Sequence, residues 1–184
     1  MKRLFIGIKI HPNDELLDFY SKLRMQFKGE KIKWVPAENF HITLKFLGDT
    51  SPSLVPRMIN SLKEIATKFE KFSIEINGLG SFKKQRRTNV IWLGLKNTEV
   101  LSKLAKEVDR SMHNFGFELE TRPFKAHLTL GRVKYISNEA RLESYVDEFK
   151  GLSFQVADID EIILFESVLQ QTGPKYKIIE KLRL

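Results

Sequence analysis

The sequence predicts an α+β protein whose sheets are mainly antiparallel and whose two halves form similar lobes. Stretches rich in β-forming residues alternate with stretches in which apolar residues recur at helical spacing. Several strand connections are short enough to be hairpins, which favours antiparallel sheets. A helix followed by a strand that begins His-x-Thr occurs once in each half, at His41 and His127. Because no linker divides residues 1–184, we expect one domain whose lobes face each other across a shared cleft.

The first half of the chain alternates strands and helices. In order, we expect a strand over 3–10, a helix over 13–27, strands over 32–36 and 40–48, a helix over 51–72 and a strand over 72–78. The strands are β-rich and end at breakers such as Pro12, Pro36 and Gly48. The helices carry apolar residues three and four apart, and Asn13 or Asp14 can cap the first.

The second half continues the same mixture. In order, we expect a loop over 79–88, a strand over 89–95, a helix over 97–116, strands over 117–120 and 126–134, a helix over 137–151, and strands over 154–167 and 175–184 joined by a turn around Gly173-Pro174. The clearest helix is 97–116, whose apolar stripe is Val100, Leu104, Val108 and Met112. Gly116 is a natural stop for it.

The composition indicates which partners the protein would bind and which kinds of site it cannot contain. The formal net charge of +8 favours anionic partners such as nucleic acid, nucleotides or acidic lipid head groups. The absence of cysteine excludes disulfides, thiolate metal ligands and cysteine nucleophiles. Lys9 interrupts the apolar N-terminal stretch, and no run approaches the ~20 apolar residues of a membrane helix. We therefore expect a cytoplasmic monomer that does not bind membranes.

Each His-x-Thr motif presents an imidazole and a hydroxyl together. Successive side chains of a strand point to opposite faces. His41 and Thr43 therefore share one face, and His127 and Thr129 share another. The aliphatic residues between them anchor each strand in the core. Two such motifs facing across a cleft would place two imidazoles around one small space.

Two imidazoles around one space suit phosphoryl chemistry. The pKa of histidine is ~6.5, so one ring can be neutral while the other is protonated. In-line displacement needs a base beside the attacking oxygen and an acid beside the leaving oxygen. Each proton transfer can contribute roughly 10²–10⁴-fold in rate. Threonine hydroxyls can donate to the non-bridging phosphate oxygens.

Other interpretations of the histidines are weaker. A single His-x-Thr motif would indicate a hydrogen-bonded structural histidine, but packing alone does not explain two copies with matching neighbours. His11 and His113 lack this setting, and we treat both as structural. A metal site would need a third ligand, and the sequence has no His-x-x-x-His or His-Glu-x-x-His pattern. We expect neither a metal nor another cofactor.

The paired stretches HITL and HLTL resemble the motifs of the 2H phosphoesterase superfamily. The wider resemblance is to its RNA 2′,3′-cyclic phosphodiesterase branch, also called 2′-5′ RNA ligase-like proteins, and it spans nearly the whole chain. It includes the stretches RLFIGIKI, KWVPAENFHITLKFLGD, VIWLGL, HLTLGRV and LFESVLQQTGPKY. The resemblance implies a bilobal α+β fold with helices outside, pseudo-twofold symmetry and a central cleft.

The resemblance also implies a reaction and roles for residues. The reaction is metal-independent hydrolysis of a terminal 2′,3′-cyclic phosphate, on RNA or a nucleotide, to a 2′-phosphate. His41 would protonate the departing 3′ oxygen and His127 would activate the water, while Thr43 and Thr129 would hold the phosphate. One residue departs from the family pattern, because Ala126 stands where proline usually precedes the second histidine. We expect a looser start to this strand with the chemistry retained.

The family also places the residue five after each histidine in the cleft. These residues are Phe46 and Arg132, which suit base stacking and phosphate contact. Strict alternation puts both on the face opposite the histidines, so this role requires a bulge or twist in each strand. Without one, they would be a core phenylalanine and a surface arginine. The basic stretch FKKQRRT, residues 82–88, is either an RNA-backbone contact or an ordinary solvated loop.

Three functions remain open at this point. The first is the cyclic phosphodiesterase. The second is ligation of RNA ends through a 2′-5′ bond, in which a 5′-hydroxyl replaces water in the same site. The sequence does not separate these two, although we expect hydrolysis to dominate in water. The third is a nucleotide- or RNA-binding module without turnover, against which the two intact histidines count.

Overall fold

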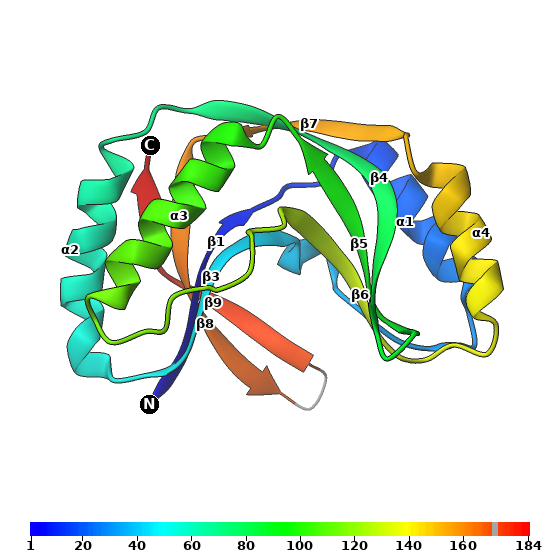
Figure 1. The fold of residues 1–184 in the computed structure, drawn as a ribbon, viewed down its shortest axis with the longest axis horizontal. Helices are drawn as coiled ribbons and strands as arrows, with labels where there is room; N and C mark the ends of the chain where they lie inside the picture. Colours follow the sequence, from blue (N-terminus) through cyan, green and yellow to red (C-terminus); the bar gives the residue numbers. More distant parts are fainter. Residues whose placement is uncertain (171–172) are drawn as a thin grey trace.

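The computed structural model describes residues 1–170 and 173–184 of the chain and shows two antiparallel sheets with helices beside them (Figure 1). In chain order, the elements are β1 (Lys2–Lys9), α1 (Asp14–Gln26), β2 (Lys31–Trp34), the 3-10 turn η1 (Ala37–Asn39), β3 (His41–Thr50), η2 (Pro52–Leu54), α2 (Val55–Ala66), β4 (Phe72–Lys84), β5 (Arg87–Lys96), α3 (Glu99–His113), β6 (His127–Tyr135), α4 (Glu139–Phe149), β7 (Ser153–Ile159), β8 (Glu161–Gln170) and β9 (Gly173–Arg183).

The two sheets repeat one arrangement. Within the described residues, the first sheet has the strand order β3-β1-β8-β9. The second has the order β2-β6-β5-β4-β7, which repeats that pattern with β2 added beside β6. The halves of the chain exchange strands, because β2 joins the second sheet and β8 and β9 complete the first. The predicted α+β class, with two lobes of mainly antiparallel sheet, is confirmed.

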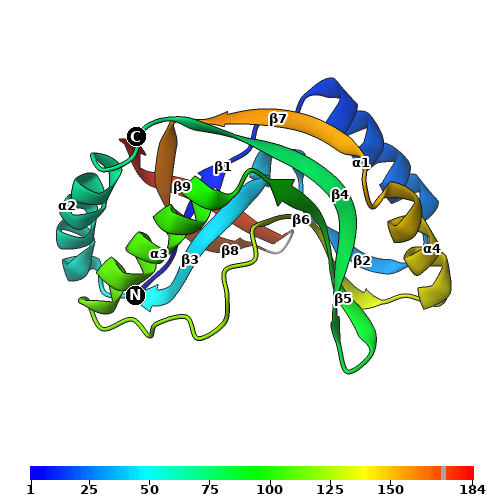
Figure 2. The same ribbon diagram turned by 45° about the horizontal axis from the view of Figure 1, so that its top comes forward.

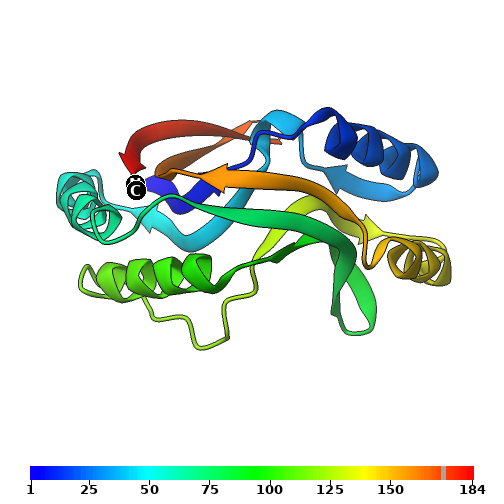
Figure 3. The ribbon, with the colours of Figure 1, turned by 90° about the horizontal axis from the view of Figure 1, so that it is seen from above.

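A pair of helices covers each sheet, and the two pairs lie at opposite ends of the molecule (Figure 3). α2 packs against β8 and β9, and α3 packs against β3 and α2, whereas α1 contacts β7 and α4 contacts β4. The apolar stripe of α3 is buried as predicted at Leu104, Val108 and Met112, but Val100 is exposed and Leu101 takes its place. No helix in the described part of the chain is long and apolar enough to cross a membrane.

The predicted loop over 79–88 is wrong, because these residues form the end of a hairpin. β4 continues to Lys84, the turn falls at Gln85 and Arg86, and β5 begins at Arg87. Figure 2 shows this hairpin projecting from the rest of the second sheet. Both turn residues have positive φ, as a two-residue hairpin turn of type I′ requires. The prediction rested on Gly80 and on the four basic residues that follow it, but both glycine and exposed basic residues also occur within strands.

Two further predictions from the sequence differ from the structure. The stretch 117–120 is not a strand, because it pairs with side chains rather than with a neighbouring strand. The stretch 154–167 is two strands, since the chain passes from the second sheet to the first at Asp160. Buried apolar residues continue on both sides of the join, at Ala157 and Ile159 before Asp160 and at Ile162 after it, and the sequence has no glycine or proline there.

The remaining boundaries are close to those predicted, with two shifts. The helix expected over 51–72 is shorter, because α2 begins after a 3-10 turn and ends at Ala66. Gly173 and Pro174, expected in a turn, pair in β9 with Gln170 and Leu169. The connection itself, residues 171–172, lies outside the described residues.

A substitution at Gly80 can test how tightly the second sheet packs. It pairs with Trp92, and a methyl group at Gly80 would overlap the indole ring. We expect Gly80→Ala to lower the free energy of unfolding by about 1–3 kcal/mol, because the rigid ring must move. Urea unfolding followed by circular dichroism measures the change.

The matched control for this prediction is Gly151→Ala, at a glycine with nothing within 4 Å of an added methyl group. That change should be neutral or slightly stabilising, because alanine restricts the unfolded chain. Equal midpoints for Gly80→Ala and the unmodified protein would contradict the packing argument.

Candidate active site

The two predicted histidines occupy equivalent places. His41 is the first residue of β3, and His127 is the first residue of β6. β3 and β6 contact each other although they belong to different sheets. Both imidazoles are half-buried. The fold therefore brings together the two motifs that lie nearly half a chain length apart.

The two imidazoles are held by the same hydrogen bond. His41 Nδ1 lies 2.7 Å from the carbonyl oxygen of Asn39, and His127 Nδ1 lies 2.6 Å from the carbonyl oxygen of Lys125. In each case the carbonyl belongs to the residue two positions earlier. Because a carbonyl oxygen only accepts, Nδ1 carries the proton in both rings. Nε2 is therefore the nitrogen that can take or give a proton in each motif.

A bulge at the same position interrupts each histidine strand. Gly7 pairs with Thr43 and Ile6 with Lys45, so Leu44 is the extra residue in β3. In β6, Trp92 pairs with Thr129 and Ile91 with Gly131, so Leu130 is the extra residue. Two successive residues point into the core at each bulge: Leu44 and Lys45 in one strand, Leu130 and Gly131 in the other.

The bulges place Phe46 and Arg132 on the histidine side of their strands, as their predicted roles require. Phe46 is 61% exposed, and the ring of Phe5 lies 6.0 Å from it and 5.0 Å from the ring of His41. Arg132 is exposed, and its positive charge acts on both imidazoles. Phe46 is therefore neither buried in the core nor remote from the site.

Thr43 and Thr129 lie two residues beyond the histidines, before each bulge, and are half-buried. Strand alternation directs their hydroxyls to the same side as the imidazoles. Neither hydroxyl makes a hydrogen bond to another described residue. The two motifs therefore offer a pair of imidazoles and a pair of hydroxyl donors, together with one guanidinium group.

Aromatic rings surround each imidazole. Tyr176 lies edge-on to His41 at 5.0 Å, beside the small buried cluster of Phe5 and Phe165. Around His127, the ring of Phe82 lies at 5.0 Å and that of Trp92 at 6.3 Å. These apolar walls restrict access of water to the rings.

Sequence reasoning did not identify Tyr176 as a site residue. It lies in β9, which joins the first sheet, and the charge of Arg132 acts on it. Burial raises the pKa of the Tyr176 hydroxyl, against the opposing charges of Arg132 and Arg3. Its position at the end of the stretch LFESVLQQTGPKY was the available signal.

The surroundings favour the neutral form of both histidines. Burial lowers the pKa of His41, and the positive charges of Arg132 and of His127 lower it further, against the hydrogen bond to Asn39. Burial and the charge of Arg132 lower the pKa of His127 in the same way, against the hydrogen bond to Lys125. The influence of His127 on the pKa of His41 places the two rings near enough for their charges to interact.

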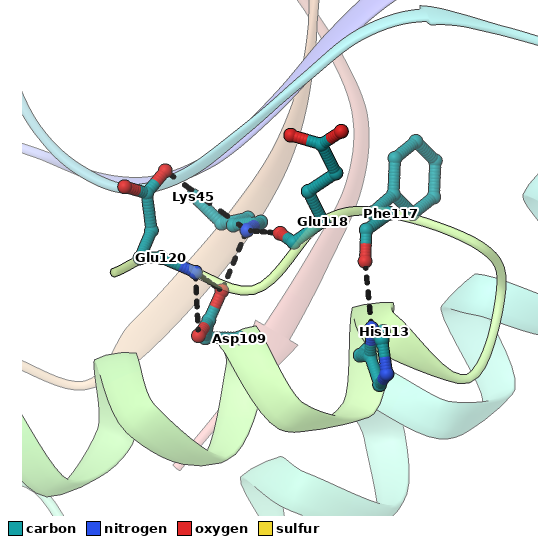
Figure 4. A network of polar contacts seen from close by, with 6 residues as sticks. All are labelled: Lys45, Asp109, His113, Phe117, Glu118 and Glu120. Atoms are coloured by element: carbon teal, nitrogen blue, oxygen red, sulfur yellow. Dashed lines mark hydrogen bonds and ion pairs between the residues drawn. The ribbon is translucent and has the colours of Figure 1, made fainter. Parts of the chain in front are cut away.

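The inward residue of the first bulge, Lys45, binds the segment that leads to the second motif (Figure 4). Its ammonium group is 2.6 Å from Asp109 Oδ1 on α3, contacts the carbonyl oxygen of Glu118, and lies 4.0 Å from Glu120. Asp109 also accepts from the backbone N–H of Glu120 at 3.2 Å. A nearly buried lysine thus connects β3 to the chain that precedes His127.

Three other residues or stretches singled out in the sequence can be placed. His113, which we expected to be structural, directs Nδ1 to the carbonyl oxygen of Phe117 at 3.0 Å (Figure 4). The basic stretch forms the end of the β4–β5 hairpin, where Lys83 pairs with Glu143 of α4 and Arg86 lies in the turn. Phe82, at the start of this stretch, is the residue that reaches a histidine. Ala126 immediately precedes β6 and is half-buried.

The described residues show no cluster of three or more histidine, aspartate or glutamate side chains that could hold a metal ion. The groups near the motifs can transfer protons through imidazole and donate hydrogen bonds from hydroxyl and guanidinium groups. This set suits an anionic ester whose leaving group needs a proton.

Comparison with known proteins agrees with this arrangement. A family model described as LigT like phosphoesterase matches two successive stretches, residues 6–92 and 93–176. Each stretch contains one His-x-Thr motif. The match covers most of the chain and divides it where the internal repeat does.

Relatives named RNA 2′,3′-cyclic phosphodiesterase occur in several organisms. The RNA 2′,3′-cyclic phosphodiesterase of Methanocaldococcus jannaschii is 33% identical over 179 residues, which cover 97% of this chain and 99% of that protein. The RNA 2′,3′-cyclic phosphodiesterase of Thermotoga maritima is 32% identical over 179 residues, covering 96% of this chain and 92% of that protein.

Solved structures share the fold. A Thermus thermophilus protein superimposes with a TM-score of 0.80 at 22% identity, covering 99% of this chain and 97% of that one. Escherichia coli LigT in complex with 3′-AMP gives a TM-score of 0.77 at 22% identity, covering 100% of this chain and 98% of that one. The same E. coli protein has been solved with NADP+ and with ATP.

The Lys45 contacts can be tested by removing the cation. Lys45→Met leaves the largely buried carboxylate of Asp109 without its cationic partner, so we expect a loss of about 3 kcal/mol in the free energy of unfolding. Urea unfolding of the two proteins measures it. The matched control is Lys63→Met, which removes an exposed pair with Glu180 and should cost less than ~1 kcal/mol. Equal losses for the two variants would contradict a special role for Lys45.

Proposed function

The chain belongs to the LigT-like phosphoesterase family, and we propose that it hydrolyses the 2′,3′-cyclic phosphate ends of RNA or nucleotides to 2′-phosphates without a metal ion. The observation that carries the proposal is the duplicated setting of His41 and His127, with the same Nδ1 hydrogen bond and the same bulge. The relatives named RNA 2′,3′-cyclic phosphodiesterase support the choice of substrate. We take the enzyme to be a single-domain, cytoplasmic monomer without a cofactor.

The proposed reaction is one in-line displacement at phosphorus. Neutral His127 accepts a proton from water through Nε2 as the water oxygen bonds to phosphorus. Protonated His41 donates the proton on its Nε2 to the 3′ oxygen as the bond between that oxygen and phosphorus breaks. The products are a 2′-phosphate and a free 3′-hydroxyl. One proton is taken and one is given, so the two histidines exchange protonation states in each turnover.

Three side chains would hold the charge that develops on the phosphate. Thr43 and Thr129 each present a hydroxyl on the histidine side of their strands and can donate to the non-bridging oxygens. Arg132 can add a charge-assisted hydrogen bond. Phe46 is exposed beside the first motif and presents a ring on which a base can stack.

The assignment is tested by product analysis with single-histidine variants. In EDTA, the protein should convert a 2′,3′-cyclic-phosphate oligonucleotide to the 2′-phosphate, which chromatography separates from the 3′-phosphate. His41→Asn and His127→Asn should each lower kcat by about 10²–10⁴-fold, because each removes one proton transfer. His11→Asn, at an exposed histidine outside the motifs, should retain full activity.

Several results of that assay would contradict the proposal. Absence of turnover with tight binding of the product would indicate a binding module. Turnover only after a metal is added would refute the metal-independent route. If a 5′-hydroxyl oligonucleotide is joined to the cyclic end faster than water attacks, the chain acts as a ligase.

The pH dependence of kcat/KM follows from the direction of the pKa shifts. The productive form needs His127 neutral and His41 protonated, so the profile should be bell-shaped. Because burial lowers the pKa of both groups below the usual ~6.5, both limbs and the maximum should lie on the acid side of that value. Initial rates with a 2′,3′-cyclic mononucleotide between pH 4.5 and 8 measure the profile.

Arg132→Gln provides the internal check on this profile. The positive charge of Arg132 lowers the pKa of both histidines. The variant should therefore have both limbs of the pH profile at higher pH, whatever its loss in kcat/KM. A maximum well above pH 7 in the unmodified protein, or limbs that do not move in the variant, would be inconsistent with the proposed pair.

A further inference from the structure

The face of the second sheet that carries His127 continues onto β2 as a basic and aromatic surface. In the antiparallel pairing of β2 with β6, Lys33 lies opposite Arg132 and Lys31 lies opposite Tyr135. Lys134 occupies a second bulge in β6, between these two pairs. Four cationic side chains and one aromatic ring therefore lie next to one another on the paired strands β2 and β6. The first of them, Arg132, belongs to the candidate active site. We call these five residues the β2–β6 surface.

The orientation of β2 places this surface on the active-site side. Ile32 and Trp34 pack against the core. The Trp34 ring lies where a side chain of Gly131 would project, 2.9 Å from that position. Gly131 is an inward residue of the β6 bulge, so Trp34 marks the core side of β2. By alternation Lys33 projects to the opposite side, with Arg132.

The β2–β6 surface is open to solvent and is not neutralised. All five residues are exposed, and the Tyr135 side chain is 54% exposed. None of the four cations forms an ion pair with another described residue. Exposed lysines elsewhere in the described part of the chain include paired ones, such as Lys83, Lys96 and Lys181, and unpaired ones, such as Lys22, Lys103 and Lys106. The β2–β6 surface differs in that its four unpaired cations adjoin one another on two neighbouring strands. A cluster of unpaired cations around an exposed aromatic ring costs electrostatic repulsion that an anionic ligand would relieve.

The surface is also continuous with the candidate active site. The charge of Arg132 acts on His41, His127 and Tyr176. The Lys33 side chain extends toward the start of β9, where its Nζ lies 3.4 Å from the position of a side chain at Gly173. Residues two apart on one strand face are about 6.6 Å apart, so the surface extends beyond the space one nucleotide occupies.

We propose that the β2–β6 surface binds the single-stranded RNA segment that precedes the cyclic phosphate. Lys31, Lys33 and Lys134 contact backbone phosphates, and Tyr135 stacks on a base. Cations interleaved with an exposed aromatic ring are the combination that holds single strands without reading their sequence. The proposal rests on the proposed function, since it makes the substrate an RNA chain rather than a mononucleotide, with Arg132 at the junction.

Direct binding tests the surface independently of turnover. The probe is a fluorescent ten-nucleotide single-stranded RNA ending in a 2′-phosphate, titrated with protein and followed by anisotropy. We compare the unmodified protein with the variant Lys31→Gln/Lys33→Gln/Lys134→Gln. We expect the variant to bind at least tenfold more weakly. The slope of log Kd against log salt should fall by about 2, at ~0.7 per lost phosphate contact.

A matched variant separates local contacts from net charge. Lys22→Gln/Lys103→Gln/Lys106→Gln removes three exposed lysines from α1 and α3, the same change in net charge. It should change Kd and the salt slope little. If the two triple variants lose affinity equally, the RNA responds to overall charge and the proposal is wrong. Tyr135→Ala should weaken binding about tenfold and Tyr135→Phe should not, because stacking needs only the ring.

Turnover then distinguishes this proposal from the proposed function. The Lys31/Lys33/Lys134 variant should raise KM for a cyclic-phosphate oligonucleotide and leave KM for a 2′,3′-cyclic mononucleotide within about twofold. An equal rise for both substrates would overturn the proposal. If neither substrate is turned over by the unmodified protein, the proposed function fails, while the anisotropy experiment still decides whether the surface binds RNA.

Discussion

The arrangement of the site depends on one extra residue in each histidine strand. In a regular strand, side chains alternate between faces, so the residue five after a histidine would point away from it. The bulges at Leu44 and Leu130 insert one position and reverse the alternation beyond it. Without the second bulge, Arg132 would lie on the side of the strand that carries the buried Leu128 and Leu130, and not at the surface as the sequence alone indicated. Burying its guanidinium group there would cost several kcal/mol. The burial of two successive residues in each strand thus fixes which later side chains lie on the same side as the histidine.

The two lobes accommodate the extra inward residue in different ways. In β6 the position is Gly131, and the absence of a side chain leaves room for Trp34 of β2. In β3 the equivalent position is Lys45, whose ammonium group is compensated by Asp109 and by a backbone carbonyl. The same backbone feature therefore attaches β2 to one lobe and the chain before His127 to the other. The repeat is conserved in geometry while the contacts around it diverge.

Much of this could be predicted from the sequence, because it follows from local periodicity. The alternation of side chains along a strand predicted that each histidine shares a face with its threonine. It also predicted that Phe46 and Arg132 reach that face only if each strand contains a bulge or twist. The short connection between the strands expected over 72–78 and 89–95 indicated a hairpin, and β4 and β5 do form one. The sequence did not show how far these strands extend, since Gly78 and Gly80 are needed for a bulge and for an approach of Trp92 that only tertiary packing defines.

The contacts that local patterns could not predict come from distant segments. Lys45 lies in an alternating strand and would ordinarily be solvated; its burial depends on Asp109, on a helix far along the chain. Tyr176 reaches His41 because the chain returns to the first sheet between β7 and β8, and β9 then pairs with β8 there. Such residues are set by topology, which short patterns do not encode.

The near-symmetry of the motifs bears on how two similar histidines could take opposite roles. Both rings carry the proton on Nδ1, and both have a lowered pKa from burial and from the charge of Arg132. The free site therefore favours two neutral imidazoles and lacks a ready acid. An anionic phosphate between the rings would offset the charge of Arg132 and raise both pKa values.

In the proposed reaction, the substrate thus promotes protonation of the histidine that serves as its acid. Which histidine this is depends on which one lies beside the 3′ oxygen, and hence on how the nucleoside is held. The lobes differ most at this point, since one presents the ring of Phe46 and the other the charge of Arg132, with the β2–β6 surface beyond it. The residues that bind the RNA would then decide which histidine acts as the acid and which as the base, and the two histidines themselves could remain alike.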